Sequence, residues 1–270
     1  MFLSTIVIAV ATSLAADQDA IKRARTLSKA AYETIYQHPF QPQIVGMAAK
    51  DLDQAHALSA KEPYVWLGAA ELVLNDGFRS GPFLQSRSYQ PGTLDRALAF
   101  AEGAIKLDDK LADAHTVAAK ILLTLGHFSD SQRELDAARQ LDPDGFKPRF
   151  YQADWYWKQG DVAKCREALR NAGAVAKTDW EQRTLLYQLE EMAEHRGDEV
   201  EHERIHKLLI ALDPKRPWPH GNYGWFLLER ERYDEAIAEF EKAVAFGSYP
   251  NAEEGLERAK RMRDAARPRH

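Results

Sequence analysis

The amino-acid sequence predicts an all-α solenoid built from stacked helix pairs. Gly92, Gly126 and Gly160 return every 34 residues, and a period of 20 to 50 residues indicates repeated units that bury their apolar faces on one another. Within the units, apolar or small residues recur at i, i+4 and i+7, which is one face of an α-helix. Alternating apolar strands joined by Asn-Gly turns are missing from the sequence.

Other markers follow the same step. Ala97, Ser131 and Cys165 are spaced 34 residues apart, and each opens a short helical stripe. The Leu-Asp pairs at 107–108 and 141–142 keep this spacing, whereas the pair at 212–213 lies 71 residues further on, or 34 plus 37. One repeat therefore carries three extra residues.

Residues 217–250 carry the clearest copy of the repeat. A small residue, Gly224, stands in the expected first helix, and Ala236 is followed by Phe240 in the second. This segment resembles a tetratricopeptide repeat (TPR), whose pattern includes a small residue in the first helix and A-x3-F in the second.

The resemblance implies a right-handed superhelical solenoid of about six helix pairs, closed by a capping helix. Residues rich in Gly, Ser, Pro and aromatics, 76–92, form an insertion in the second repeat. We expect a single elongated domain over 17–250, with repeats at 17–62, 63–111, 112–145, 146–182, 183–216 and 217–250, and a capping helix and tail at 251–270.

The resemblance also implies a concave groove, lined by the first helix of each pair, that binds a protein or peptide. Aromatic anchors dominate binding hot spots, and each ring at these positions either faces the groove or packs on a neighbouring helix. The repeat register favours the groove for Trp157 and Trp225. The expected groove residues are Lys120, Lys147, Phe150, Asp154, Trp157, Tyr187, Glu191, Trp218, Asn222 and Trp225.

The insertion is a second candidate binding surface, because long loops in compact repeats often carry function. Its large side chains are Phe78, Arg79, Phe83, Arg87 and Tyr89. The alternative is a lid whose aromatic rings pack over a widened repeat, and both roles are compatible.

An H-E-x-x-H sequence at 202–206 is the one enzymatic signal, since two histidines one helical turn apart can bind zinc beside a glutamate base. Charged neighbours, Glu201 and Lys207, and a register that buries both histidines oppose a zinc hydrolase. Neither Glu229 nor Glu231 downstream can be assigned as a third ligand. We therefore expect no catalytic residue, metal or cofactor, and no other common catalytic motif is present.

Composition narrows the partners. The chain has 36 Lys and Arg against 41 Asp and Glu, with no continuous basic stripe for a nucleic acid backbone. Its lone Cys165 falls in a core position. We expect a noncatalytic interaction scaffold, with a self-assembling structural subunit, and hence a homo-oligomer, as the alternative to a zinc hydrolase.

Residues 1–16 resemble a signal peptide. They form an apolar run that ends in a small-x-small site, Ser13-Leu14-Ala15, although Lys and Arg are missing before the run. This segment predicts an exported protein, periplasmic or secreted; the chain is cytoplasmic if 1–16 is not a signal. No later run approaches the roughly 20 apolar residues of a membrane span.

Overall fold

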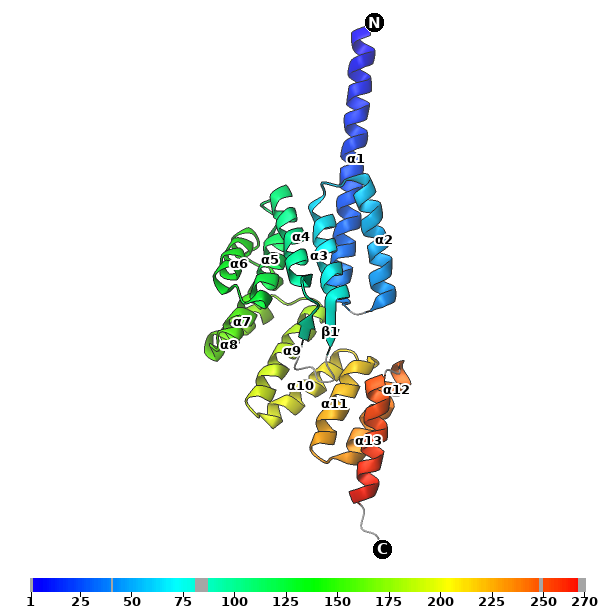
Figure 1. Ribbon diagram of the computed structural model, residues 1–270, viewed down its shortest axis with the longest axis vertical. Helices are drawn as coiled ribbons and strands as arrows, with labels where there is room; N and C mark the ends of the chain where they lie inside the picture. The colour runs from blue at the N-terminus through cyan, green and yellow to red at the C-terminus, as the bar shows by residue number, and fades with distance from the viewer. Residues whose placement is uncertain (1, 40, 81–86, 248–249, 267–270) are drawn as a thin grey trace. The chain divides into compact units, whose positions relative to one another are not determined.

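The computed structural model describes residues 2–39, 41–80, 87–247 and 250–266. Thirteen helices and one short hairpin occur in these residues (Figure 1). The chain divides into two compact units, unit 1 at Met1–Val175 and unit 2 at Ala176–His270. The all-α solenoid prediction is confirmed except for the hairpin, while the hand of the superhelix stays a prediction.

Unit 1 consists of successive helices that pack in pairs, α1 with α2, α3 with α4, α5 with α6 and α7 with α8. Gly126 and Gly160 follow α5 and α7 with φ of 81° and 75°, so the repeating glycines supply the predicted left-handed turns. The helices are α1 Phe2–Gln37, α2 Pro42–Leu58, α3 Pro63–Gly77, α4 Thr93–Leu107, α5 Ala112–Leu125, α6 Phe128–Leu141, α7 Phe146–Lys158 and α8 Val162–Gly173.

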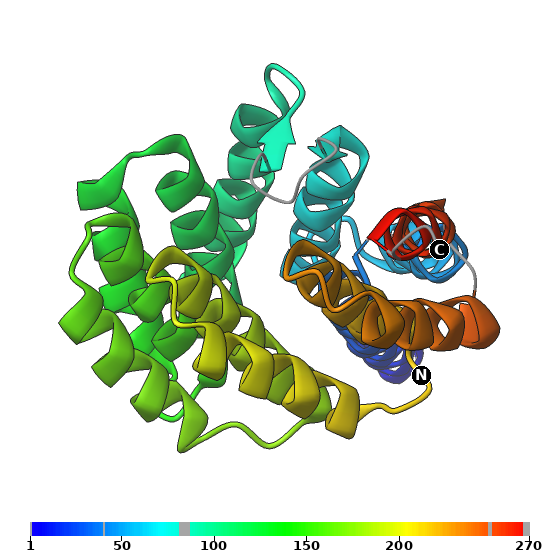
Figure 2. The same cartoon turned by 90° about the horizontal axis from the view of Figure 1, so that it is seen from below.

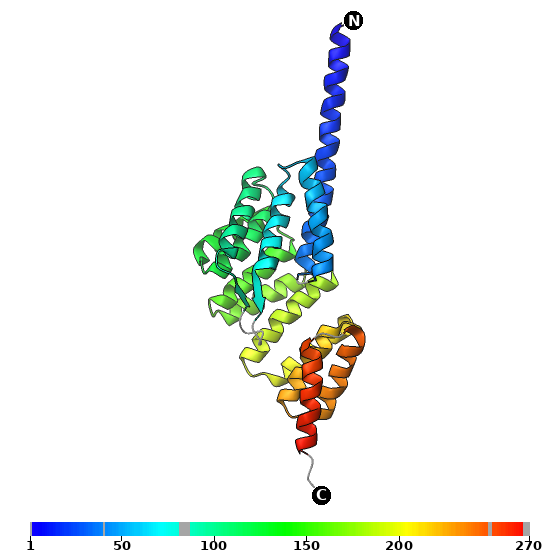
Figure 3. The ribbon, with the colours of Figure 1, turned by 45° about the vertical axis from the view of Figure 1, so that its right-hand side comes forward.

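The first part of α1 runs beyond the helices that flank it (Figure 3). Among residues whose side chains are described, the buried positions of α1 begin at Ala24. Within the described part of the chain, no helix combines the length and the apolar character needed to cross a lipid bilayer.

A small antiparallel hairpin joins the ends of α3 and α4 (Figure 2). Its strands are β1, Phe78–Ser80, and β2, Arg87–Tyr89, and the rings of Phe78 and Tyr89 meet edge to face at 5.7 Å. The sequence analysis missed these strands because three-residue segments show no recognisable alternation. Arg79 and Arg87 belong to the strands, and Phe83 lies outside the described residues.

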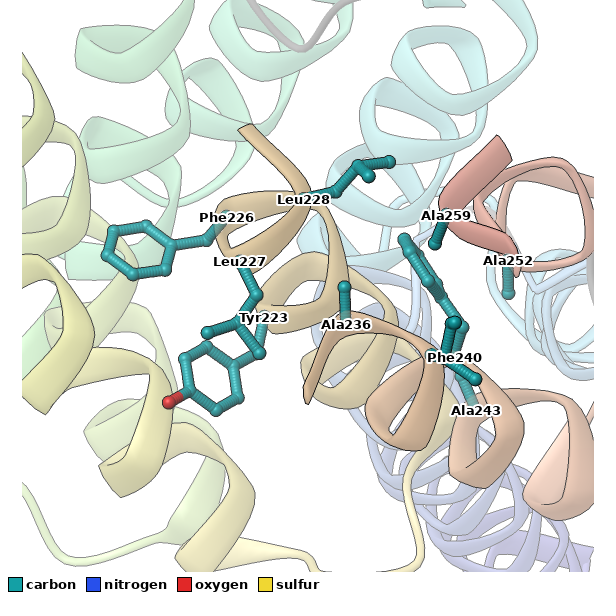
Figure 4. Packing of buried hydrophobic residues seen from close by; sticks show 10 residues of the cluster. Tyr223, Phe226, Leu227, Leu228, Ala236, Phe240, Ala243, Ala252 and Ala259 are labelled. Carbon is teal, nitrogen blue, oxygen red and sulfur yellow. The ribbon is translucent and has the colours of Figure 1, made fainter. Parts of the chain in front are cut away.

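Unit 2 contains five helices: α9 Asp179–His195, α10 Glu199–Leu212, α11 Pro217–Glu229, α12 Tyr233–Gly247 and α13 Pro250–Ala266. Figure 4 shows its core, where Phe240 of α12 lies between α11 and α13. A Cβ atom built on Gly224 or Gly255 would come within 2.9 or 2.4 Å of the Phe240 ring. These glycines therefore make the space that the motif phenylalanine fills, and α13 covers the end of the core.

The division into two units differs from the single domain expected from the sequence. It falls between residues 175 and 176, inside the repeat at 146–182 that carries the three extra residues. Those residues lengthen the connection between α8 and α9, so a constant 34-residue register does not continue across it.

Two histidines connect the helices of their pairs in the same way. In α5, Nδ1 of His115 lies 2.8 Å from the Glu134 carboxylate of α6, and Nε2 lies 3.0 Å from the Asp109 carbonyl. In α11, His220 has the same contacts with the Glu239 carboxylate at 2.6 Å and the Pro214 carbonyl at 2.9 Å. The sequence signal was a histidine followed 19 residues later by a glutamate in both repeats.

The substitution His115→Gln tests this contact. The hydrogen bond to Glu134 raises the pKa of His115 above 6.5 and lowers the pKa of Glu134 below 4.5. The stabilisation by the histidine is complete below pH 6.5 and is lost as the pH rises through the raised pKa; that by Glu134 is lost as the pH falls through its lowered pKa. We expect urea unfolding to show a loss of about 1.5–3 kcal/mol at pH 5.5 and a smaller loss at pH 9.

The matched control is His127→Gln, because His127 is exposed and its side chain caps no helix. It should change stability little at either pH. An equal effect of His115→Gln at both pH values would contradict a charged contact with Glu134.

Candidate functional site

The first helices of four successive pairs in unit 1 contribute to one cluster, which we call the tyrosine–lysine network. Its two lysines lie among carboxylates and tyrosine rings in the place predicted for the groove. The members are Tyr32, Glu33 and Tyr36 of α1, Tyr64 and Glu71 of α3, Asp113 and Lys120 of α5, and Lys147 and Tyr151 of α7.

Lys147 lies at the centre of this network. Its Nζ lies 2.9 Å from Oε1 of Glu33 and 3.1 Å from Oδ1 of Asp113. It also lies 4.7 and 4.6 Å from the ring centroids of Tyr32 and Tyr36. Burial opposes the charge, but Asp113 and Glu33 outweigh it and raise the pKa of Lys147. The amine is therefore a cation held by carboxylates and aromatic faces.

Lys120 has a similar environment one helix pair earlier. Its Nζ contacts both carboxylate oxygens of Glu71 at 2.9 and 3.0 Å, and lies 5.0 Å from the Tyr36 ring centroid. Burial lowers the pKa of Lys120, but Glu71 more than compensates and raises it above the ordinary value. Close by, the hydroxyl groups of Tyr36 and Tyr151 lie 2.7 Å apart, which connects α1 to α7.

These contacts correct the predicted groove in unit 1. Lys120 and Lys147 bind carboxylates of their own chain, and Phe150 is buried and stacks on Phe146 at 5.8 Å. Asp154 and Trp157 are half-buried. Side chains of α1 therefore occupy much of this surface, which the sequence analysis missed because it assigned no role to the two tyrosines one turn apart in α1.

The predicted groove residues of unit 2 are more accessible. Tyr187 on α9 and Trp218 on α11 are 36% and 51% exposed, Glu191 is exposed and Asn222 is half-buried. Trp225 differs from the prediction: its ring packs edge-on against Phe240 at 5.5 Å, and Arg258 of α13 lies 5.8 Å from it. Since Phe240 is fully buried, Trp225 is a packing residue of the core.

Two arginines lie beside the exposed aromatics of unit 2. Arg183 is one turn before Tyr187 on α9, and Arg216 precedes α11, two residues before Trp218. Burial lowers the pKa of Arg183, and the like charge of Arg216 lowers it further; burial raises the pKa of Tyr187, which Arg216 partly offsets. Arg183 and Arg216 thus lie near each other and near Tyr187. We call Arg183, Tyr187, Arg216 and Trp218 the aromatic–arginine patch.

The H-E-x-x-H segment lies on α10 with both histidines turned toward α9. The rings of His202 and His206 stack at 4.7 Å, and Oε1 of Glu190 lies 3.8 Å from Nε2 of His202 and 3.5 Å from Nδ1 of His206. The neighbouring carboxylate therefore comes from the preceding helix rather than from Glu229 or Glu231. Burial, with the nearby charges of His202 and Arg230, lowers the pKa of His206 to about 3.

Glu203, the glutamate of the motif, takes part in different contacts. Its carboxylate accepts hydrogen bonds from Tyr223, Arg232 and Lys207, each at 2.8 Å. The hydrogen bonds from Arg232 and Lys207 lower the pKa of Glu203 to about 2. A general base works best with a pKa near the working pH, so this carboxylate is poorly suited to the role that a zinc hydrolase requires.

Replacing Lys147 by methionine tests the tyrosine–lysine network. The change leaves Glu33 and Asp113 without their shared cation, and breaking such a buried pair costs about 3–5 kcal/mol in urea unfolding. Lys164→Met is the control, because Lys164 pairs with Asp161 in an exposed position, and it should leave the urea midpoint nearly unchanged. Equal effects of the two substitutions would show that the network contributes no special stability.

Comparison with known proteins supports the fold. No protein-family model and no curated protein matches the sequence. Among solved structures, the chain is similar to one in the APC/C hetero-tetramer Cut9–Hcn1, with a TM-score of 0.59 and 12% identity over 90% of this chain and 45% of that one. It is also similar to yeast Tom70, with a TM-score of 0.53 and 14% identity over 91% of this chain and 55% of that one.

A third similar structure is PilF of Pseudomonas aeruginosa, with a TM-score of 0.50 and 15% identity over 73% of this chain and 84% of that one. The chain thus spans about half the length of the Cut9–Hcn1 and Tom70 chains. All three are tetratricopeptide-repeat proteins, and the fold of this chain is that of a tetratricopeptide-repeat protein.

Proposed function

We propose that the protein is a noncatalytic interaction scaffold that binds an acidic peptide segment of a partner protein on unit 2. The observation that carries this proposal is the aromatic–arginine patch, in which Tyr187 and Trp218 are exposed on first helices beside two arginines. Trp, Tyr and Arg are the residue types most enriched in binding hot spots. The tetratricopeptide-repeat fold supports the same function, because it presents extended surfaces for binding.

The charge of the patch indicates the kind of peptide. Within the described residues, neither Arg183 nor Arg216 has a carboxylate within 4.0 Å, although Asp179 and Asp213 act on Arg183 from further away. Two adjacent guanidinium groups repel each other, and a carboxylate placed between them would relieve this repulsion with charge-assisted hydrogen bonds. Tyr187 and Trp218 would then contact apolar side chains of the same peptide.

Peptide selection from a displayed random library on the full chain tests this function. We expect selected peptides to be rich in Asp and Glu, and the double substitution Tyr187→Ala/Trp218→Ala to weaken the best synthetic peptide about 30-fold or more, which corresponds to the loss of one hot spot. Arg183→Gln/Arg216→Gln should weaken acidic peptides more than neutral ones.

The control is Val200→Ala, which removes apolar area from an 84% exposed residue on a second helix, α10. This variant should bind as the unsubstituted chain does. Circular dichroism melting should be unchanged in all variants. Equal peptide affinity of the Tyr187/Trp218 variant and the unsubstituted chain, or failure of the library to give any binder, would contradict the proposal.

Export is a separate proposal, supported by the signal-like sequence of 1–16. The described buried side chains of α1 begin at Ala24, so cleavage before Ala16 would leave the packing of α1 against α2 and α3 in place. We expect intact-mass measurement of the protein from its native host to show a chain that begins near Ala16. A full-length mass in the cytoplasmic fraction would instead support the cytoplasmic alternative.

A further inference from the structure

Glu190, His202 and His206 bring three metal-binding atoms together inside unit 2. One ligand atom from each residue lies within 4.8 Å of the other two, and the carboxylate oxygen of Glu190 is 3.8 and 3.5 Å from the two histidine nitrogens. With bonds of 2.0–2.1 Å, ligand atoms of a tetrahedral zinc ion lie about 3.4 Å apart. The side chains thus need only small movements to coordinate one ion.

The state of His206 is a second, independent observation. The residue is only 2% exposed, and among the described residues neither of its ring nitrogens has a hydrogen-bond partner. Leaving a buried polar group unsatisfied costs about 1–3 kcal/mol, and each such group in a native protein needs an explanation. A metal ion bound to Nδ1 would satisfy one of the two nitrogens.

The surroundings of the cluster resemble the walls of a metal site rather than an accidental contact. The Phe226 ring lies 4.8 Å from the His202 ring and 5.0 Å from the His206 ring, and Tyr223 lies 5.5 Å from His206. Together they restrict how the imidazoles can turn. The side chains of His202 and Glu190 are 12% and 17% exposed, which leaves an approach for an ion and room for a water molecule as a further ligand.

The donor set selects the class of metal. Two imidazole nitrogens and one carboxylate oxygen suit divalent transition metals such as Zn²⁺, whereas Ca²⁺ and Mg²⁺ prefer oxygen ligands alone. Arg230 is the nearby opposing charge, and it is shared by Glu199 at 3.5 Å and Glu229 at 3.8 Å. These carboxylates reduce its repulsion of a bound cation.

We propose that Glu190, His202 and His206 bind one divalent transition-metal ion of the Zn²⁺ class, which links α9 to α10. Glu203 is held by Arg232 and Lys207 outside this cluster, so the ion has a structural role and the H-E-x-x-H sequence is not used for hydrolysis. The site explains why the repeat at 183–216 departs from the pattern of its neighbours: the two histidines replace packing residues with metal ligands. This inference is independent of peptide binding by the aromatic–arginine patch.

Calorimetric titration of the metal-free full chain with Zn²⁺ tests the site. We expect one strongly bound ion per chain, and Glu190→Gln and His206→Gln should each weaken binding by more than about 100-fold, since even loss of an outer-shell partner costs 10- to 100-fold. Zn²⁺ should also raise the melting temperature of the unsubstituted chain but not of either variant. Co²⁺ in place of Zn²⁺ should give a visible absorption spectrum that both variants lose.

Two features keep the test decisive. Glu190→Gln preserves the size of a half-buried side chain, so it remains informative if His206→Gln does not fold. His127→Gln removes an exposed histidine in unit 1 and should bind Zn²⁺ as the unsubstituted chain does. The proposal is overturned if the chain binds no Zn²⁺ in the micromolar range, or if Glu190→Gln binds it with unchanged affinity.

Discussion

The close approach of paired helices is the constraint on which the rest of this structure depends. Where α3 meets α4 and α11 meets α12, the contacts are made by alanine and glycine, because larger side chains have no room. Ala97, Ala101 and Ala104 of α4 are fully buried, and a Cβ on Gly224 would touch Phe240. Small residues at a fixed step set the spacing of the pairs, and the remaining side chains of the first helices are then brought against one another.

The two units use these first helices differently. In unit 1, α1 contributes tyrosines and a glutamate that neutralise Lys147 and fill the face predicted to bind a partner. In unit 2, aromatic side chains of α9 and α11 remain exposed next to arginines. The same repeat thus supplies an internal polar core in one unit and a candidate recognition surface in the other. The sequence pattern alone does not distinguish these uses.

The helix pairs and their turns could be predicted from the sequence because both follow from local physics. The glycines at Gly126 and Gly160 have the left-handed backbone that their spacing suggested, and Cys165 is fully buried as expected. The candidate site was harder, because periodicity tells which face a residue occupies but not what covers that face. Lys147 and Trp225 illustrate this: a distant helix covers the first, and the buried ring of Phe240 packs against the second.

The histidine contacts show the same limit from the opposite side. His202 and His206 were visible in the sequence, but Glu190 was not assigned to them because it lies on the neighbouring helix, 12 residues upstream of His202. Searches for a third ligand favoured the downstream glutamates, as in familiar zinc motifs. In a stack of helix pairs, however, the nearest side chains across a contact come from the partner helix of the same pair.

The position of α13 has a consequence for how this protein could be handled or altered. Gly255 lies directly on the Phe240 ring, and Ala252 and Ala259 of α13 are fully buried. A chain shortened before Pro250 would therefore present a broad apolar surface around Phe240 to solvent. Uncovered ends of repeat arrays lower solubility, so shortened forms would tend to join end to end, and any fusion to this protein should begin after Ala266.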